Sequence, residues 1–139
     1  ISNDSIQNKK TFDFFISHSY NDKDLIRMIK KAFNASKFNV YCDWTSDNDF
    51  LKRDPDAKHY TELILKKRIE QSDNIVFVRT NNTNDHNDNI FSDWIKMELD
   101  YSKKLNKPIF CINLLNDNKN EFSLIEYDKE NNTIKVQSI

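Results

Sequence analysis

Four short apolar segments alternate with amphipathic segments along the chain, and no other feature restricts the fold as strongly. The apolar segments are TFDFFIS (11–17), KFNVYCDW (37–44), NIVFVRT (74–80) and KPIFCINLL (107–115). Apolar runs of this length, with little polar interruption, are typical of strands that are buried on both faces. We therefore expect four β-strands over these residues.

The segments between these strands predict helices. Helices are expected over 23–36, where apolar residues recur at spacings of three and four, over 59–72, and from an N-cap at Ser92 to about Leu105. The residues between the second strand and second helix, 45–58, have turn and loop chemistry. Pro55 lies among them and is expected to interrupt any helix there.

Strands that alternate with helices in this way build βαβ units, so the sequence predicts an α/β domain with a parallel sheet and helices on both faces. Each crossover is expected to be right-handed. We expect a single domain over 11–139, preceded by a frayed N-terminal segment over 1–10. Residues 116–139 leave two alternatives, a β-hairpin or an edge strand followed by a terminal segment.

Composition excludes several classes of function. The formal net charge is −1, which gives no electrostatic case for binding nucleic acid or an anionic membrane. No apolar run approaches the roughly 18 residues of a membrane-spanning helix, and no signal-peptide pattern is present, so we expect a cytoplasmic protein. Glycine is absent, which excludes the glycine-rich loops that cradle phosphates.

The cysteines and histidines do not indicate a metal site. Cys42 and Cys111 lie within apolar strand segments, where buried thiols suited to a reducing compartment are the simplest interpretation. His18, His59 and His86 are scattered, and no spacing resembles a metal-ligand set. We expect no metal and no bound cofactor.

Polar and aromatic residues follow the predicted strands where a ligand would bind. In open parallel sheets, ligands bind beyond the carboxyl ends of the strands. Ser17 and His18 stand at the end of the first strand, and Asp43 and Trp44 at the end of the second. These four residues are candidates for substrate binding.

The stretch FSDWIKMELDY (91–101) places Trp94 four residues before Glu98. On a helix, residues at this spacing share a face. Because this helix begins just beyond the third strand, its first turns are expected to open on the same edge of the sheet. A carboxylate and an indole would therefore lie near the ends of the first two strands.

Three motifs in order resemble the Toll/interleukin-1 receptor (TIR) domain family. They are FDFFISHSYNDKD in the first strand and turn, RIEQSDNIVFVRT from the second helix into the third strand, and SDWIKMELDYSKKLNKPIFCINL from the third helix into the fourth strand. The resemblance covers roughly 11–115, and DWTSDNDFLKR after the second strand is similar to bacterial TIR proteins of anti-phage defence of the Thoeris type. It implies a flavodoxin-like open sheet of strand order 2-1-3-4-5.

The resemblance implies that the chain is an enzyme, and it places the catalytic carboxylate at Glu98. Enzymatic members cleave the bond between nicotinamide and ribose in NAD, which is a substrate here and not a cofactor. Nicotinamide leaves a cationic pyridinium as a neutral base, so no general acid is needed, and one carboxylate can stabilise the charge that develops on the ribose. Trp94 can stack on a flat ring or anchor the helix to the core.

The family also implies partners and products. The product could be ADP-ribose, a cyclic ADP-ribose isomer or a conjugate, and in signalling members it is sensed by a separate effector protein. TIR domains also self-associate. Lys52 and Arg53 could meet the pyrophosphate of NAD or could be solvated loop charges.

Two other functions fit the same pattern. The chain could be a non-catalytic TIR interaction module, which would have no need of Glu98, or a transferase that processes nucleosides. The sequence also departs from the family, since it has no glycine in the loop after the second strand and no clear final strand and helix.

Overall fold

The computed structural model describes residues 11–42, 55–84, 89–90, 92–115, 117, 119 and 121–136. Its strands are β1 (Phe12–Ser17), β2 (Val40–Cys42), β3 (Ser72–Arg79), β4 (Ile109–Asn113), β5 (Ser123–Asp128) and β6 (Thr133–Val136). Its helices are the 3-10 helix η1 (Tyr20–Asp22) and the α-helices α2 (Lys23–Ala35), α4 (Pro55–Glu70) and α5 (Asp93–Lys104). The predicted segment 1–10 and the candidate residues Asp43, Trp44, Lys52 and Arg53 lie outside the described residues.

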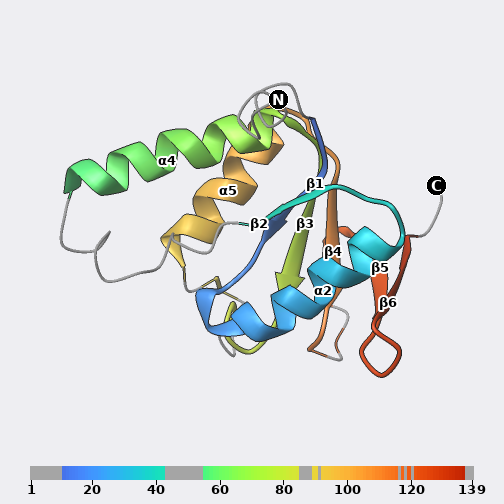
Figure 1. Cartoon of the computed structure of the whole chain (residues 1–139). Helices are drawn as coiled ribbons and strands as arrows, with labels where there is room; N and C mark the ends of the chain where they lie inside the picture. The colour runs from blue at the N-terminus through green and yellow to red at the C-terminus, as the bar shows by residue number, and fades with distance from the viewer. Residues whose placement is uncertain are drawn as a thin grey trace.

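The strands form one sheet in the order β2-β1-β3-β4-β5-β6 (Figure 1). β1 to β5 pair in parallel, which confirms the predicted α/β fold and its strand order, and β6 adds an antiparallel edge strand. Ser17 at the end of β1 lies opposite Phe77, and β3 continues to Arg79, so the carboxyl ends of these two neighbouring strands lie at the same edge of the sheet. The hairpin of β5 and β6 decides between the two alternatives for the tail.

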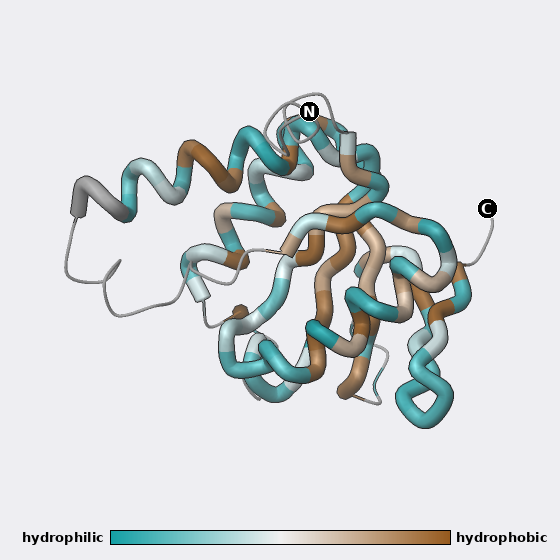
Figure 2. The backbone as a smooth tube through the Cα atoms, in the orientation of Figure 1, coloured by the Kyte–Doolittle hydropathy of each residue, from teal (hydrophilic) through white to brown (hydrophobic). Residues whose placement is uncertain are grey.

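Helices cover both faces of the sheet. Successive residues of a strand point to opposite faces, so each strand contributes apolar side chains to both helix layers. Phe14 and Ile16 of β1 pack with Ile26, Ile29 and Phe33 of α2. On the other face, Phe15 packs with Leu65 and Ile69 of α4. Further along, α5 packs over β3 and β4. The strands are the most hydrophobic part of the tube in Figure 2, with polar loops outside them.

The second helix begins one turn earlier than the sequence predicts. Residues 45–58 are predicted to form a loop in which Pro55 would interrupt any helix. In the structure, α4 begins at Pro55 itself. A proline is well suited to the first helical position, because the N–H that it lacks would have no partner inside the helix. The prediction was therefore wrong about the role of this proline, which starts the helix and does not break it.

Two helices end without glycine in a motif that usually contains it. After α2, the amide of Phe38 donates to Phe33 O and the amide of Lys37 donates to Asn34 O, with Lys37 at φ 68°. Asn106 occupies the equivalent position after α5, at φ 58°. These are Schellman motifs, in which a left-handed residue allows the last carbonyls to be satisfied. Asparagine tolerates this conformation better than lysine does.

A buried arginine holds the segment that follows β4. Arg79 at the end of β3 is 3% exposed, and its Nη1 donates to Asn113 Oδ1 at 3.0 Å and to Asp117 Oδ1 at 2.6 Å. The hydrogen bond from Arg79 holds the pKa of Asp117 below its ordinary value of 3.8. The ion pair therefore joins two neighbouring strand ends beside β5.

We expect Lys37→Gly to raise the free energy of unfolding by about 1 kcal/mol, because glycine adopts positive φ without the steric cost of a Cβ atom. Urea denaturation of the variant against the parent chain measures this. The matched control is Lys31→Gly, an exposed position inside α2, which should lower stability by about 1 kcal/mol. A loss of stability at both positions would contradict the account of Lys37.

The stability conferred by Asp117 is expected to depend on acid pH. Because the pKa of Asp117 is lower in the folded chain than in the unfolded chain, its contribution is fully present above pH 3.8 and is lost as the pH falls through the folded pKa. The difference in unfolding free energy between the parent and Asp117→Asn should therefore be constant at neutral pH and shrink in acid. A difference that grows in acid would contradict this.

Candidate active site

Glu98 lies inside the protein, where α5 crosses the end of β1. Ser92 caps α5 by accepting from the amide of Ile95, which confirms the predicted N-cap. Ile95 and Leu99 are buried against the sheet, and Glu98, on the same inner side of the helix, is only 5% exposed. The helix therefore carries an acidic side chain into the protein.

The carboxylate of Glu98 accepts a hydrogen bond from Ser17. Ser17 Oγ lies 2.7 Å from Glu98 Oε1, and Ser17 has no exposed surface. A buried carboxylate is costly unless hydrogen bonds compensate for its lost hydration. The contact joins residues 81 positions apart in the sequence. The predicted gathering of Ser17 and Glu98 at one edge of the sheet is thus seen as direct contact.

A second serine supports the same turn of the helix. Ser102, one turn beyond Glu98, donates to the main-chain oxygen of Glu98 at 2.6 Å. Ser102 is fully buried, and this bond reaches the main chain of Glu98 and not its carboxylate. The two serines therefore hold different parts of one residue, Ser17 the side chain and Ser102 the backbone.

His18 and Ser19 continue the chain from Ser17 into the turn after β1. His18 is 7% exposed, and its Nδ1 lies 3.3 Å from the carbonyl oxygen of Ile16. Because a carbonyl oxygen only accepts, Nδ1 carries the proton in this contact. Ser19 Oγ accepts from the amide of Asn21 and so begins η1.

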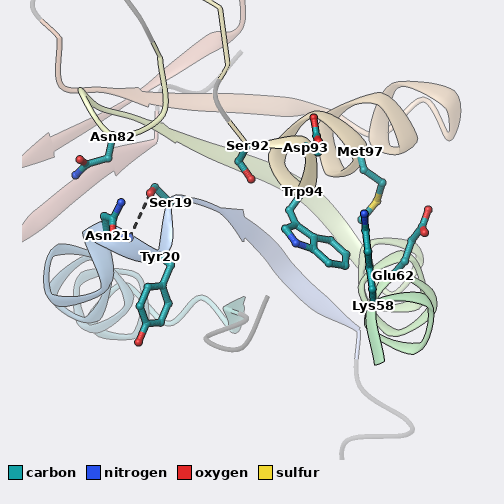
Figure 3. A pocket seen from close by; sticks show the side chains of 10 residues that line it. All are labelled: Ser19, Tyr20, Asn21, Lys58, Glu62, Asn82, Ser92, Asp93, Trp94 and Met97. Atoms are coloured by element: carbon teal, nitrogen blue, oxygen red, sulfur yellow. Dashed lines mark hydrogen bonds between the residues drawn. The ribbon is translucent and has the colours of Figure 1, made fainter. Parts of the chain in front are cut away.

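Trp94 lies one turn before Glu98 and contacts both the apolar core and a cavity. On one side the half-buried indole packs against the apolar cluster of Phe15, Leu65 and Ile69. On the other side it lines a cavity, as Figure 3 shows. The two interpretations from the sequence, a core anchor and a ring that can stack on a ligand, are therefore compatible.

The cavity beside Trp94 has a volume of about 580 Å³. This is within the range of small-molecule and cofactor sites. The turn after β1, α4, the loop after β3 and the start of α5 contribute its lining (Figure 3). The lining residues are Ser19, Tyr20, Asn21, Lys58, Glu62, Asn82, Ser92, Asp93, Trp94 and Met97.

Glu98, Ser17 and His18 are absent from this lining, and all three are buried. They adjoin it in sequence, however, since Ser19 follows His18 and Trp94 is one turn from Glu98. A buried acid therefore stands next to an open cavity that has an aromatic wall. Such a site suits a ligand that carries a flat ring and develops positive charge.

A buried aspartate fixes the loop that forms one rim of the cavity. Asp22, 8% exposed, accepts from Thr80 Oγ1 and from Asn82 Nδ2, each at 2.6 Å. The main-chain N–H of Asn82 in turn donates to Thr80 Oγ1 at 3.1 Å. These bonds tie the loop after β3 to the start of α2. Sequence reasoning missed Asp22, because nothing in a polar turn distinguishes a buried aspartate from a solvated one.

Several lining residues were also missed from the sequence. Met97 could have been found, since it lies three residues after Trp94 and so shares its side of α5. Lys58 and Glu62 lie on α4, and Lys58 falls in its first turn, which the sequence predicts as part of a loop. Their position depends on how α4 packs against α5, which no spacing within the chain reveals.

Among residues 11–42, 55–84 and the later described positions, no group of three or more His, Cys, Asp and Glu could hold a metal ion. Cys111 is buried, as its strand position predicts, whereas Cys42, which is also predicted to be buried, is only half-buried. Within the same part of the chain, no helix has the length and apolar character needed to cross a membrane.

Comparisons with known proteins place this fold and site in a family. A family model described as the TIR-like domain of Thoeris protein ThsB matches residues 15–119. The chain is 50% identical over 134 residues to the putative cyclic ADP-D-ribose synthase TIR2 of Cytobacillus dafuensis, covering 96% of this chain and 34% of that protein. It is 29% identical over 106 residues to the probable 3′ cyclic ADP-D-ribose synthase ThsB′ of Bacillus cereus (strain MSX-D12), covering 76% of this chain and 51% of that protein.

The chain therefore spans about a third of the first relative and about half of the second. The matched region begins within β1 and runs past β4, so it contains both Ser17 and Glu98. On this match, with the predicted strand order observed, the chain belongs to the TIR-like domain family of the Thoeris protein ThsB.

Proposed function

We propose that this chain is an NAD-cleaving TIR domain that breaks the nicotinamide–ribose bond and makes a cyclic ADP-ribose signal in anti-phage defence. The observation that carries the proposal is the buried Glu98 carboxylate, held by Ser17 next to the cavity that Trp94 lines. The names of the two relatives support a cyclic product. A non-catalytic scaffold would have no use for a carboxylate buried at this place.

The chemistry needs one ionised carboxylate, and it needs neither a general acid nor a cofactor. As the bond breaks, its electron pair leaves with nicotinamide, which becomes neutral, and positive charge develops on the ribose. The ionised carboxylate of Glu98 stabilises that charge or holds a ribose hydroxyl. A nucleophilic group of the same ADP-ribose then captures the anomeric carbon to give a cyclic product, whereas capture by water gives ADP-ribose, and either route releases one proton.

The remaining candidate residues have supporting roles in this proposal. Trp94 stacks on the nicotinamide or the adenine ring. Ser17 is completely buried, so it serves the substrate by holding the carboxylate of Glu98. His18 lies at the end of β1 beside the cavity, and Asp43 and Trp44, beyond the described residues, are proposed to complete the substrate contacts.

Self-association is part of the proposal, and α4 offers a surface for it. Tyr60, Leu63 and Ile64 are 68%, 51% and 49% exposed and lie at the spacing of one helix face. The chain would work in the cytoplasm, where NAD is available, and a separate effector protein would sense its product.

Glu98→Gln is expected to lower kcat for nicotinamide release from NAD by about 10²–10³-fold, because it removes a charge that acts in the transition state. Stability should change little, since the amide oxygen of glutamine can still accept from Ser17. The assay uses purified chain with a crowding agent, because TIR enzymes can require assembly. The matched control is Asp100→Asn, which removes an exposed carboxylate from the same helix.

Equal rates for Glu98→Gln and Asp100→Asn would show that another group is responsible. A parent chain that stays silent under crowding and when tethered would favour the scaffold function. Mass spectrometry of the same reactions identifies the product.

Ser17→Ala is expected to lower kcat by about tenfold or more, because hydrogen bonds to charged groups are worth about 1.5–3 kcal/mol. Ser102→Ala is the matched control, since it removes a buried hydroxyl that holds the backbone of Glu98. Steady-state kinetics and thermal unfolding are measured on both variants. We expect both to lose stability but only Ser17→Ala to lose kcat, and an equal loss of kcat in both would contradict a specific role for Ser17.

A further inference from the structure

The described residues lining the cavity include one cationic side chain, Lys58 of α4. We propose that Lys58 contacts the pyrophosphate of the dinucleotide and so selects ligands that carry phosphate. This inference rests on the proposed function, and it assigns a role to a residue that the sequence did not single out.

The other charged side chains in the lining have partners on their own helices. Glu62 pairs with Lys66 at 3.3 Å, and Asp93 lies 3.9 Å from Lys96. The two residues of each pair are one helical turn apart, so the lysine partly neutralises the negative charge of the carboxylate. Glu62 and Asp93 therefore repel an anionic ligand less than two unpaired carboxylates would.

Lys58 differs from these residues, because no acid in the described part of the chain lies within 4.0 Å of its amine. Glu62, one turn further along α4, is engaged with Lys66 instead. An ammonium group with three donors and no local carboxylate is available to a ligand that enters the cavity.

The direction of the side chain supports this role. In Figure 3, the exposed side chain of Lys58 extends from α4 toward Trp94 and Met97 of α5, so its amine can reach a ligand in the cavity. The indole and the ammonium group therefore meet the same ligand from two different helices. A ligand that satisfies both has a flat ring and a nearby anionic group, which is the chemistry of a nucleotide.

The competing interpretation is a solvated surface lysine, which would contribute nothing to binding. The two interpretations differ in what they predict for ligands with and without phosphate. A charge-assisted hydrogen bond to phosphate is worth about 1.5–3 kcal/mol, or about tenfold or more in binding. A solvated lysine would give no difference between the two kinds of ligand.

The experiment measures inhibition of NAD cleavage by two fragments of NAD, ADP-ribose, which carries the pyrophosphate, and nicotinamide, which does not. Lys58→Ala is expected to raise the inhibition constant of ADP-ribose and the KM for NAD about tenfold, and to leave the inhibition constant of nicotinamide within twofold. Lys58→Arg should restore most of the affinity for ADP-ribose. Added salt should weaken ADP-ribose binding to the parent more than to Lys58→Ala.

Lys67→Ala is the matched control, since it removes an exposed lysine from α4 that does not line the cavity. An unchanged ADP-ribose constant in Lys58→Ala, or an equal change in Lys67→Ala, would overturn the inference. So would a parallel loss for nicotinamide, which would indicate a damaged site. These outcomes leave the proposed function intact, whereas a parent chain that does not cleave NAD would refute the proposed function itself.

Discussion

The hydrogen bond from Ser17 to Glu98 joins the end of β1 to α5, and the chemistry proposed for this domain depends on it. A carboxylate that is 5% exposed loses most of its hydration, so it needs donors to remain ionised inside the protein. Ser17 provides one at 2.7 Å. The acid is thus kept near a cavity and out of bulk water, which is the surrounding that the proposed role of its charge requires.

The fold supplies this contact through the parallel sheet. β1 and β3 pair side by side with their carboxyl ends at the same edge, and α5 crosses back over the face that α4 also covers. Asp22 and Arg79 then fix the segments that follow β3 and β4 at the same edge. The site is therefore built on short bonds from rigid elements, and the helices α4 and α5 provide its two walls.

The strands and helices could be predicted because the apolar runs and the helical periodicity are local signals, whereas the strand order was predicted from the resemblance to TIR domains. The four strands, the order of the sheet and the N-cap at Ser92 are confirmed, and Trp94 lies on the cavity. The start of α4 was missed, since the same proline can end one helix and begin another. Lys58 and Asp22 were missed for a different reason, because burial and the packing of one helix against another arise only in three dimensions.

The most direct test of the central claim is a crystal structure of the Glu98→Gln chain with NAD bound. The account predicts that the anomeric carbon of the nicotinamide riboside lies within about 3.5 Å of the side chain at position 98, with one ring of NAD against the indole of Trp94. A bound NAD whose scissile bond lies on the far side of the cavity from position 98, or outside the cavity, would contradict it.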